Sequence, residues 1–291
     1  MTPLRQKFIE DMQLRGLANK TQTAYLNAVR DLAAHFQKSP DEITETELRA
    51  YFVFLTNEKK VSYSAFRVAL CGIKLFYEFT VQRQWTIFDL VQPKKKRTLP
   101  VVLSREEVQH LLGTVRLPQY RVCLTTIYTC GLRLREALHL QVPDIDGDRM
   151  VLHVRYGKGA KERYVPLPER TLELLRSYWV IHAHPKLVFP SRNSRTAAQP
   201  ISPRSVQHVF KAALKENGIE KQASIHTLRH SWATHLLEAG VNIRQIQSYL
   251  GHGSIRTTSI YFHLTQSGEK HAAGIINELM GDLPTLSRSL P

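Results

Sequence analysis

The chain has 291 residues, of which 43% are hydrophobic, and this composition excludes a disordered protein and allows two compact domains, each with its own core. Forty Lys and Arg against 25 Asp and Glu give a formal net charge of +15, which points to an anionic partner, with nucleic acid as the first candidate. A ribosomal, heparin-binding or membrane-surface protein is the alternative, although the basic residues are spread along structured segments rather than gathered in a tail.

Residues 1 to about 90 are predicted to form a small helical domain. A capping box of Thr44 and Glu47 predicts the start of its third helix, whose buried face is expected to carry Leu48, Tyr51, Phe52 and Leu55. The periodicity of apolar residues predicts the other helices, over 4–14, 21–36 (with Leu26, Val29, Ala33 and Phe36 inward) and 62–80.

The segment VQPKKKRTLP, residues 91–100, separates this domain from the rest of the chain. It combines two prolines with four consecutive cations and has no apolar periodicity, as an interdomain linker would. Because a cation run between two basic domains can lie along a phosphate backbone, we expect it to contact DNA through Lys94, Lys95, Lys96 and Arg97. A solvated tether is the alternative.

Helices are again expected to dominate from residue 101 onward. Ser104 and Glu107 form a second capping box, and RVCLTTIYTCGLRLREALHL (121–140) is an apolar helical stretch. The exception is RMVLHVRYGKGAKERYVPL (149–167), which predicts a β-hairpin with Lys158 at or near its tip. Further helices are expected over 203–216, 227–238, 242–251 (capped by Asn242 and ended by Gly251) and from Ser254.

The cysteines and the N-terminal residues indicate in which cellular compartment the protein is expected. Cys71, Cys123 and Cys130 form no CxxC pair and lie in apolar helical runs, which indicates core residues rather than disulfides or a cysteine metal site. The opening residues MTPLRQKFIEDM carry charges where a signal peptide needs an apolar run, and no 18-residue apolar run occurs. We therefore expect a cytoplasmic protein that does not have a membrane as a partner.

The stretch IHTLRHSWATHLLEAG, residues 225–240, places several imidazoles and a guanidinium on an apolar helix. His226 and Arg229 are three residues apart and so share a helix face, and His252 and Tyr261 follow across a Gly-bounded turn. Arginine offers a fork to two phosphate oxygens, histidine can move a proton near neutral pH, and a deprotonated tyrosine is a nucleophile. The set indicates phosphate chemistry. The opposite side of this helix is expected to face the core through Leu228, Trp232, Leu236 and Leu237.

A zinc site formed by His226, His230 and His235 is the alternative for this stretch. The HExxH pattern is absent, and Arg229 would place a cation beside the dication, which is electrostatically costly. We therefore expect no metal here and interpret His230 and His235 as packing or hydrogen-bonded helix residues.

Four separated motifs resemble, in order and spacing, those of the tyrosine recombinases, the phage integrase and Xer-type family. GLRLREALHL resembles the first arginine box, GKGAKERYVPL the family β-hairpin, HTLRHSWATHLLEAG the H-x-x-R box, and LGHGSIRTTSIYFHL the final box. Arg135 and Phe262 depart from the residues that are common in the family. Each matched residue, taken alone, would be interpreted as structural. The resemblance therefore rests on the occurrence of all the matched residues together in one chain. It implies the catalytic residues Arg133, Lys158, His226, Arg229, His252 and Tyr261, with Glu136 in support.

The resemblance covers nearly the whole chain and therefore implies its architecture. The expected fold is mainly α with a small β-hairpin or sheet, and two domains that close as a clamp around DNA. The implied divisions are a SAM-like helical core-binding domain over 1–90, the basic linker over 91–100, an α+β catalytic domain over 101–265, and a tail over 266–291 that could dock on a neighbouring protomer.

The function that the resemblance implies is site-specific DNA recombination through a 3′-phosphotyrosyl intermediate, for integration, excision or resolution. Tyr261 would attack the phosphodiester, His226 would handle its proton, and Lys158 would protonate the leaving 5′-oxygen. Arg133 and Arg229 would hold the non-bridging oxygens, to which His252 would also donate. No cofactor is implied.

The implied partners are duplex DNA with paired recombination sites and further copies of the chain, as a tetramer on DNA in the bacterial nucleoid. Two alternatives remain open: a type IB topoisomerase, which rejoins the original strand, and a catalytically silent DNA-binding accessory protein.

Overall fold

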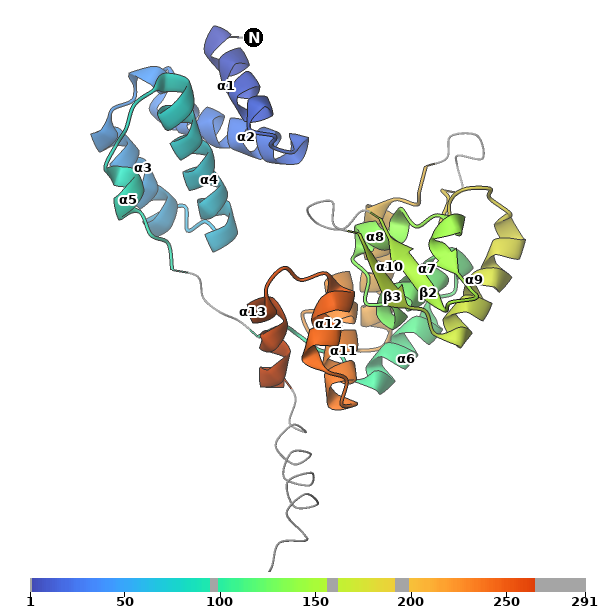
Figure 1. The fold of residues 1–291 in the computed structure, drawn as a ribbon. Helices are drawn as coiled ribbons and strands as arrows, with labels where there is room; N and C mark the ends of the chain where they lie inside the picture. Colours follow the sequence, from blue (N-terminus) through green and yellow to red (C-terminus); the bar gives the residue numbers. More distant parts are fainter. Residues whose placement is uncertain (1, 95–98, 156–161, 192–198, 265–291) are drawn as a thin grey trace, which may run out of the picture. The chain divides into compact units, whose positions relative to one another are not determined.

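The computed structural model describes residues 2–94, 99–155, 162–191 and 199–264 (Figure 1). The chain divides into two compact units, residues 1–97 and 98–291. Helices dominate the described part of both units, and the second unit adds a small antiparallel sheet (Figure 1). The expected fold class, mainly α with a small sheet, is confirmed.

The first unit is helical over its described residues. Thr44 and Glu47 form the predicted capping box at the start of its third helix, where the Thr44 N–H donates to Glu47 Oε2 at 2.9 Å. In chain order the elements are α1 (Pro3–Leu14), α2 (Asn19–Phe36), the 3₁₀ turn η1 (Pro40–Glu42), α3 (Glu45–Asn57), α4 (Tyr63–Leu75), the π-helical η2 (Phe76–Val81) and α5 (Ile87–Leu90).

Two helices of this unit differ in detail from the sequence prediction. The predicted fourth helix changes from α to π at Phe76, so Phe76 and Tyr77 are both buried. On α2, Val29 is buried as predicted, but Leu32 rather than Phe36 completes the buried face. Phe36 is only partly buried against the same core, and α2 packs closely on α4, where a Cβ at Gly72 would lie 3.0 Å from the α2 backbone.

The second unit combines helices with a three-stranded antiparallel sheet of order β1-β2-β3. The predicted hairpin is confirmed, with Leu152 opposite Val165 and both side chains buried. Strand β1 is not predicted, because two residues are too few to show a periodicity. The elements are α6 (Arg105–Thr114), α7 (Pro118–Thr129), α8 (Leu134–Leu138), η3 (Val142–Asp144), β1 (Ile145–Asp146), β2 (Val151–Val154), β3 (Arg163–Pro166), α9 (Glu169–His182), α10 (Pro203–Glu216), α11 (Ile225–Glu238), α12 (Ile243–Leu250), α13 (Ile255–Thr258) and the 3₁₀ turn η4 (Ser259–Leu264).

The predicted helical stretch 121–140 is interrupted, and the interruption positions the first arginine box. Helix α7 ends at Thr129, and the chain turns at Gly131, whose φ is +59°. A Cβ at Gly131 would lie 2.4 Å from the Trp232 ring, so this turn requires glycine for both conformation and space. Arg133 therefore lies immediately before α8 rather than inside a continuous helix.

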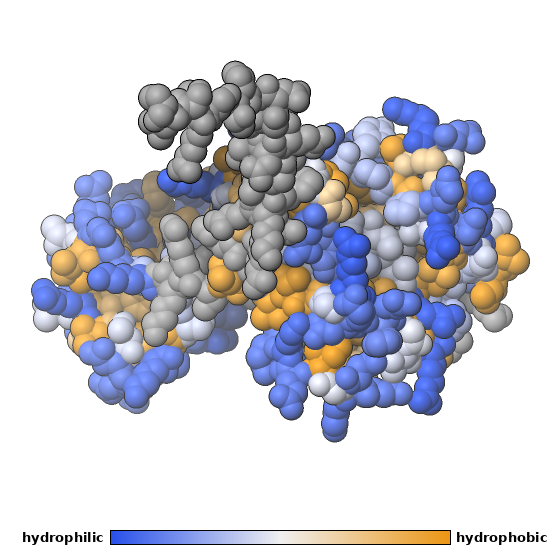
Figure 2. Space-filling view, turned by 90° about the horizontal axis from the view of Figure 1, so that it is seen from below, coloured by the Kyte–Doolittle hydropathy of each residue, from blue (hydrophilic) through white to orange (hydrophobic). Residues whose placement is uncertain are grey.

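On the face of each unit drawn in Figure 2, hydrophilic side chains predominate and hydrophobic ones occur in small groups between them. Within the described ranges, no helix combines the length and the apolar character that crossing a bilayer requires.

Candidate active site

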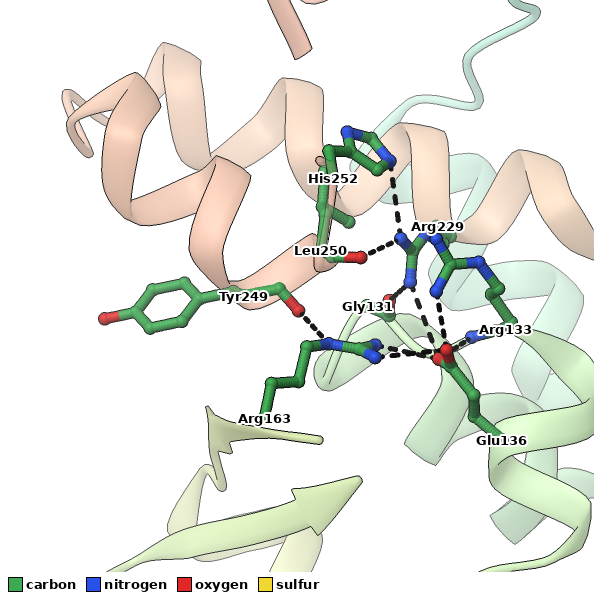
Figure 3. Close-up of polar contacts among 8 residues, drawn as sticks. All are labelled: Gly131, Arg133, Glu136, Arg163, Arg229, Tyr249, Leu250 and His252. Atoms are coloured by element: carbon green, nitrogen blue, oxygen red, sulfur yellow. Dashed lines mark hydrogen bonds and ion pairs between the residues drawn. The ribbon is translucent and has the colours of Figure 1, made fainter. Parts of the chain in front are cut away.

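A buried carboxylate, Glu136, lies at the centre of the site and is surrounded by three arginines (Figure 3). It accepts hydrogen bonds from the backbone N–H of Arg133 at 2.8 Å and from the guanidinium of Arg133 at 2.6 Å. Arg163 donates to both of its oxygens, at 3.1 and 2.8 Å, and Arg229 lies 3.6 Å away. The supporting role expected for Glu136 thus has a geometric basis.

The charge of Glu136 is fixed by these partners. Burial by itself would raise the pKa of the carboxyl group, but the hydrogen bonds and charge of Arg163, together with those of Arg133, lower it to about 2. The side chain is therefore an anion near neutral pH. One negative charge holds three positive charges, which leaves a local excess of cations at the site.

Arg229 is held in place by two backbone carbonyls from different elements. Its side chain is 1% exposed, and it donates to the carbonyls of Gly131 at 2.7 Å and Leu250 at 2.5 Å (Figure 3). The first carbonyl belongs to the turn between α7 and α8, and the second to the last turn of α12. Since a guanidinium has five N–H groups, these two bonds leave donors for a further acceptor. The side chain of Arg133 is 24% exposed, so its guanidinium presents further N–H donors to the solvent side of the site.

Arg163 is a member of the cluster that the sequence analysis does not single out. From strand β3 it donates to Glu136 and, through Nε, to the carbonyl of Tyr249 at 2.6 Å, and it packs against Gly251 (Figure 3). A sequence signal for it exists. Strand residues two apart face the same side, so Arg163 shares the inward face of Val165, and an inward arginine requires a buried counter-ion.

His252 follows the left-handed Gly251 that ends α12. Its Nδ1 lies 3.0 Å from the buried hydroxyl of Thr258, and its Nε2 lies 3.4 Å from Arg229 (Figure 3). Burial, and then the charges of Arg229 and Arg133, lower the pKa of this imidazole to about 4. The ring is therefore neutral near pH 7, and Thr258 fixes its orientation.

Tyr261 lies in η4 and is 1% exposed. Its hydroxyl is 2.9 Å from Nδ1 of His230. Burial raises the pKa of this phenol to about 12, although the charges of Arg229 and Arg133 act in the opposite direction. The charges of both arginines therefore act on the candidate nucleophile.

His226 lies on the first turn of α11 and is exposed on its outer side. Neighbouring protein atoms nevertheless desolvate the ring in part, and with Arg229 and Arg133 they lower its pKa. The residue lines an open groove together with Gln207, His208 and Lys211 of α10. His226 therefore faces the side from which a polyanion could approach.

The two other histidines of α11 are hydrogen-bonded, in agreement with the sequence interpretation. His235 Nδ1 lies 2.9 Å from the hydroxyl of Tyr128, whereas the partner of His230 is the candidate nucleophile itself. Within the described residues, no three His, Cys, Asp or Glu side chains come together as a possible metal site.

Several expected site residues are not part of this description. Lys158, on the segment between β2 and β3, lies outside the described residues, as do Lys95, Lys96 and Arg97 of the linker and the tail 266–291. Lys94 is exposed.

Comparison with known proteins identifies both units. Residues 101–267 match the model of the phage integrase family, and residues 4–87 match the N-terminal SAM-like domain of phage integrases. The integrase/recombinase-type protein y4qK of Sinorhizobium fredii is 41% identical over 265 residues, covering 91% of this chain and 85% of the relative. The tyrosine recombinase XerD of Oceanobacillus iheyensis is 32% identical over 277 residues, covering 87% and 90%.

The solved structures show the same fold. The XerH site-specific recombinase, bound to palindromic difH substrate in a post-cleavage complex, aligns with a TM-score of 0.68 at 20% identity, covering 92% of this chain and 83% of the XerH chain.

Proposed function

The chain belongs to the phage integrase family, and from this premise we propose that it is a site-specific recombinase that cleaves and rejoins DNA strands through a 3′-phosphotyrosyl intermediate. The observation that carries the proposal is a cluster in the second unit in which Glu136 orients Arg133 and Arg229, with the Tyr261 hydroxyl 2.9 Å from His230, the residue that follows Arg229. A phosphodiester held by the two arginines would meet hydrogen-bond donors and an excess of positive charge, and Tyr261 is the proposed nucleophile.

The proposed cleavage is a transfer of the phosphoryl group from a deoxyribose oxygen to tyrosine. The Oη atom of Tyr261 forms a bond to phosphorus while the bond from phosphorus to the 5′-oxygen breaks. Lys158 gives a proton to that oxygen, and a histidine of α11 takes the proton of the phenol. Attack by the 5′-hydroxyl of a partner strand reverses each transfer. Since the number of phosphodiester bonds is conserved, the cycle needs no nucleotide hydrolysis.

Arg133 and Arg229 are the proposed clamp on the non-bridging oxygens, where negative charge grows in the transition state. Glu136 orients both guanidinium groups before DNA arrives, so little reorganisation is left for the chemical step. His252 is the proposed further donor to the phosphate, with Thr258 holding its other nitrogen. The same arginines stabilise the tyrosinate character that develops as the phenol loses its proton.

The remaining assignments concern partners and divisions of the chain. We propose that residues 1–90 form the core-binding domain, that 91–100 link it to the catalytic domain along the DNA backbone, and that 266–291 dock on a neighbouring protomer. The bound partner is duplex DNA with paired sites, held by a tetramer in the bacterial nucleoid. The net charge of +15 supports phosphate binding. A type IB topoisomerase activity would differ by relaxing DNA without a defined site, and an accessory protein would not need Tyr261.

The test is covalent capture on a nicked duplex. The DNA is the protein's own site, recovered by selecting bound fragments from the DNA that flanks its gene. Wild-type protein is expected to accumulate a covalent protein–DNA complex, and Tyr261→Phe to bind equally and form none, because only the nucleophilic oxygen is removed. An equal amount of complex with the Phe variant would refute Tyr261 as the nucleophile.

A further inference from the structure

We infer that His230, rather than His226, accepts the proton of Tyr261 as the phenol attacks the phosphodiester, an inference that rests on the recombinase function proposed above. The sequence resemblance gives this proton to His226, the first residue of the H-x-x-R box. The structure places the second histidine of the same helix on the tyrosine.

The geometry distinguishes the two imidazoles. His230 Nδ1 lies 2.9 Å from Tyr261 Oη, within the reach of direct proton transfer. His226 is one helical turn earlier, with its ring centroid 4.9 Å from that of His230. Among the described residues, no hydrogen bond joins His226 to Tyr261, and His226 faces the open groove instead. His226 thus faces the groove, and His230 faces the nucleophile.

The surroundings of His230 keep it neutral and able to accept a proton. The groups that act on it are His226 and Arg229 on its own helix, Tyr261 on η4, and His252 after α12. Burial first, and then His226 and Arg229, lower its pKa to about 4. Near pH 7 the ring therefore carries a single proton, and placing that proton on Nε2 leaves the Nδ1 lone pair directed at the phenol.

The same environment sets the timing of the transfer. With pKa values of about 12 for Tyr261 and about 4 for His230, the proton stays on the tyrosine in the resting enzyme. As the bond from Oη to phosphorus forms, the phenol becomes strongly acidic and its proton passes to Nδ1. The anionic phosphate nearby stabilises the resulting imidazolium. In the rejoining step His230 returns this proton to the departing Tyr261 oxygen, and Lys158 takes back the proton that it gave to the 5′-oxygen, so both transfers are balanced over the cycle.

The variant His230→Asn separates a proton acceptor from a positioning group. Its side-chain oxygen can replace Nδ1 as a hydrogen-bond acceptor for Tyr261, but an amide does not take up a proton at neutral pH. The matched control is His235→Asn, because His235 makes the same Nδ1-to-tyrosine contact, at 2.9 Å to Tyr128, on the same helix. The variant His226→Gln tests the alternative, in which His226 accepts the proton of Tyr261.

The assay is single-turnover formation of the covalent complex at saturating protein, between about pH 6.5 and pH 9.5. The DNA is the nicked duplex described above with sulfur in place of the bridging 5′-oxygen, so that departure of the leaving group needs no acid. We expect a flat profile for wild type and for His235→Asn. We expect His230→Asn to be slower by about 100-fold or more at pH 7 and to gain close to tenfold per pH unit, as hydroxide replaces the missing base.

Four results would overturn the inference. Wild-type or faster cleavage by His230→Asn would mean that the hydrogen bond only holds the nucleophile in its buried position. A loss that does not change with pH would reduce His230 to a structural residue. A pH-dependent recovery confined to His226→Gln would return the proton to His226. Absence of a covalent complex with the wild-type protein would overturn the recombinase proposal as well. The first three results leave wild-type cleavage intact, so they overturn the role of His230 alone.

Discussion

Replacing Glu136 by glutamine removes the one negative charge that holds Arg133, Arg163 and Arg229, with almost no change in shape. The magnitude follows from the pKa of the carboxyl group, which falls from an ordinary value of 4.5 to about 2 on folding. This gap of about 2.5, at about 1.4 kcal/mol for each pKa unit, corresponds to roughly 3–4 kcal/mol of stability. The figure agrees with the roughly 3–5 kcal/mol that breaking a buried ion pair costs.

The sign of the effect sets its pH dependence. A carboxyl group with a lowered pKa in the folded protein contributes its full stability above the unfolded value of 4.5 and loses it as the pH falls through about 2. We therefore expect Glu136→Gln to lower the free energy of unfolding by roughly 3–4 kcal/mol at pH 7 and by about half as much at pH 3.

The assay is urea unfolding followed by tryptophan fluorescence in a Trp85→Phe background, where Trp179 and Trp232 report on the second unit alone. The control is Glu216→Gln, which removes an exposed ion pair with Arg116 and should cost less than about 1 kcal/mol. If Glu136→Gln costs no more than this control, or if its cost is the same at pH 3 and pH 7, the account of the cluster is wrong.

Three further changes test other parts of the structure. Gly131→Ala should lower the free energy of unfolding by about 2 kcal/mol or more, because its Cβ would overlap the Trp232 ring and its φ is positive; a midpoint of urea unfolding equal to wild type would contradict this. Arg229→Lys should slow covalent complex formation about 100-fold, since a point charge lacks the fork that contacts Gly131 and Leu250, and cleavage near the wild-type rate would remove Arg229 from the clamp. Lys158→Ala should be slow on ordinary DNA and recover on DNA with a bridging 5′-sulfur, whereas equal defects on both substrates would make Lys158 a phosphate-binding residue only.

The sequence by itself determined the features that depend on neighbouring residues. The capping boxes at Thr44 and Ser104, the left-handed stop at Gly251 and the alternation of the hairpin are local, because each is set by residues within a few positions. The four motifs were sufficient to identify the family, since their order and internal spacing can be read from the chain directly.

The tertiary structure decided which of these residues meet. The turn at Gly131 depends on a ring about 100 positions later in the chain, at Trp232. The partner of Arg163 is a carboxylate on a different element, and the imidazole nearest the Tyr261 hydroxyl is His230 rather than the motif residue before it. Helical periodicity places His226 and His230 on one face of α11 and gives no information about which of the two the later segment will contact. Only the packing of η4 against α11 supplies that choice.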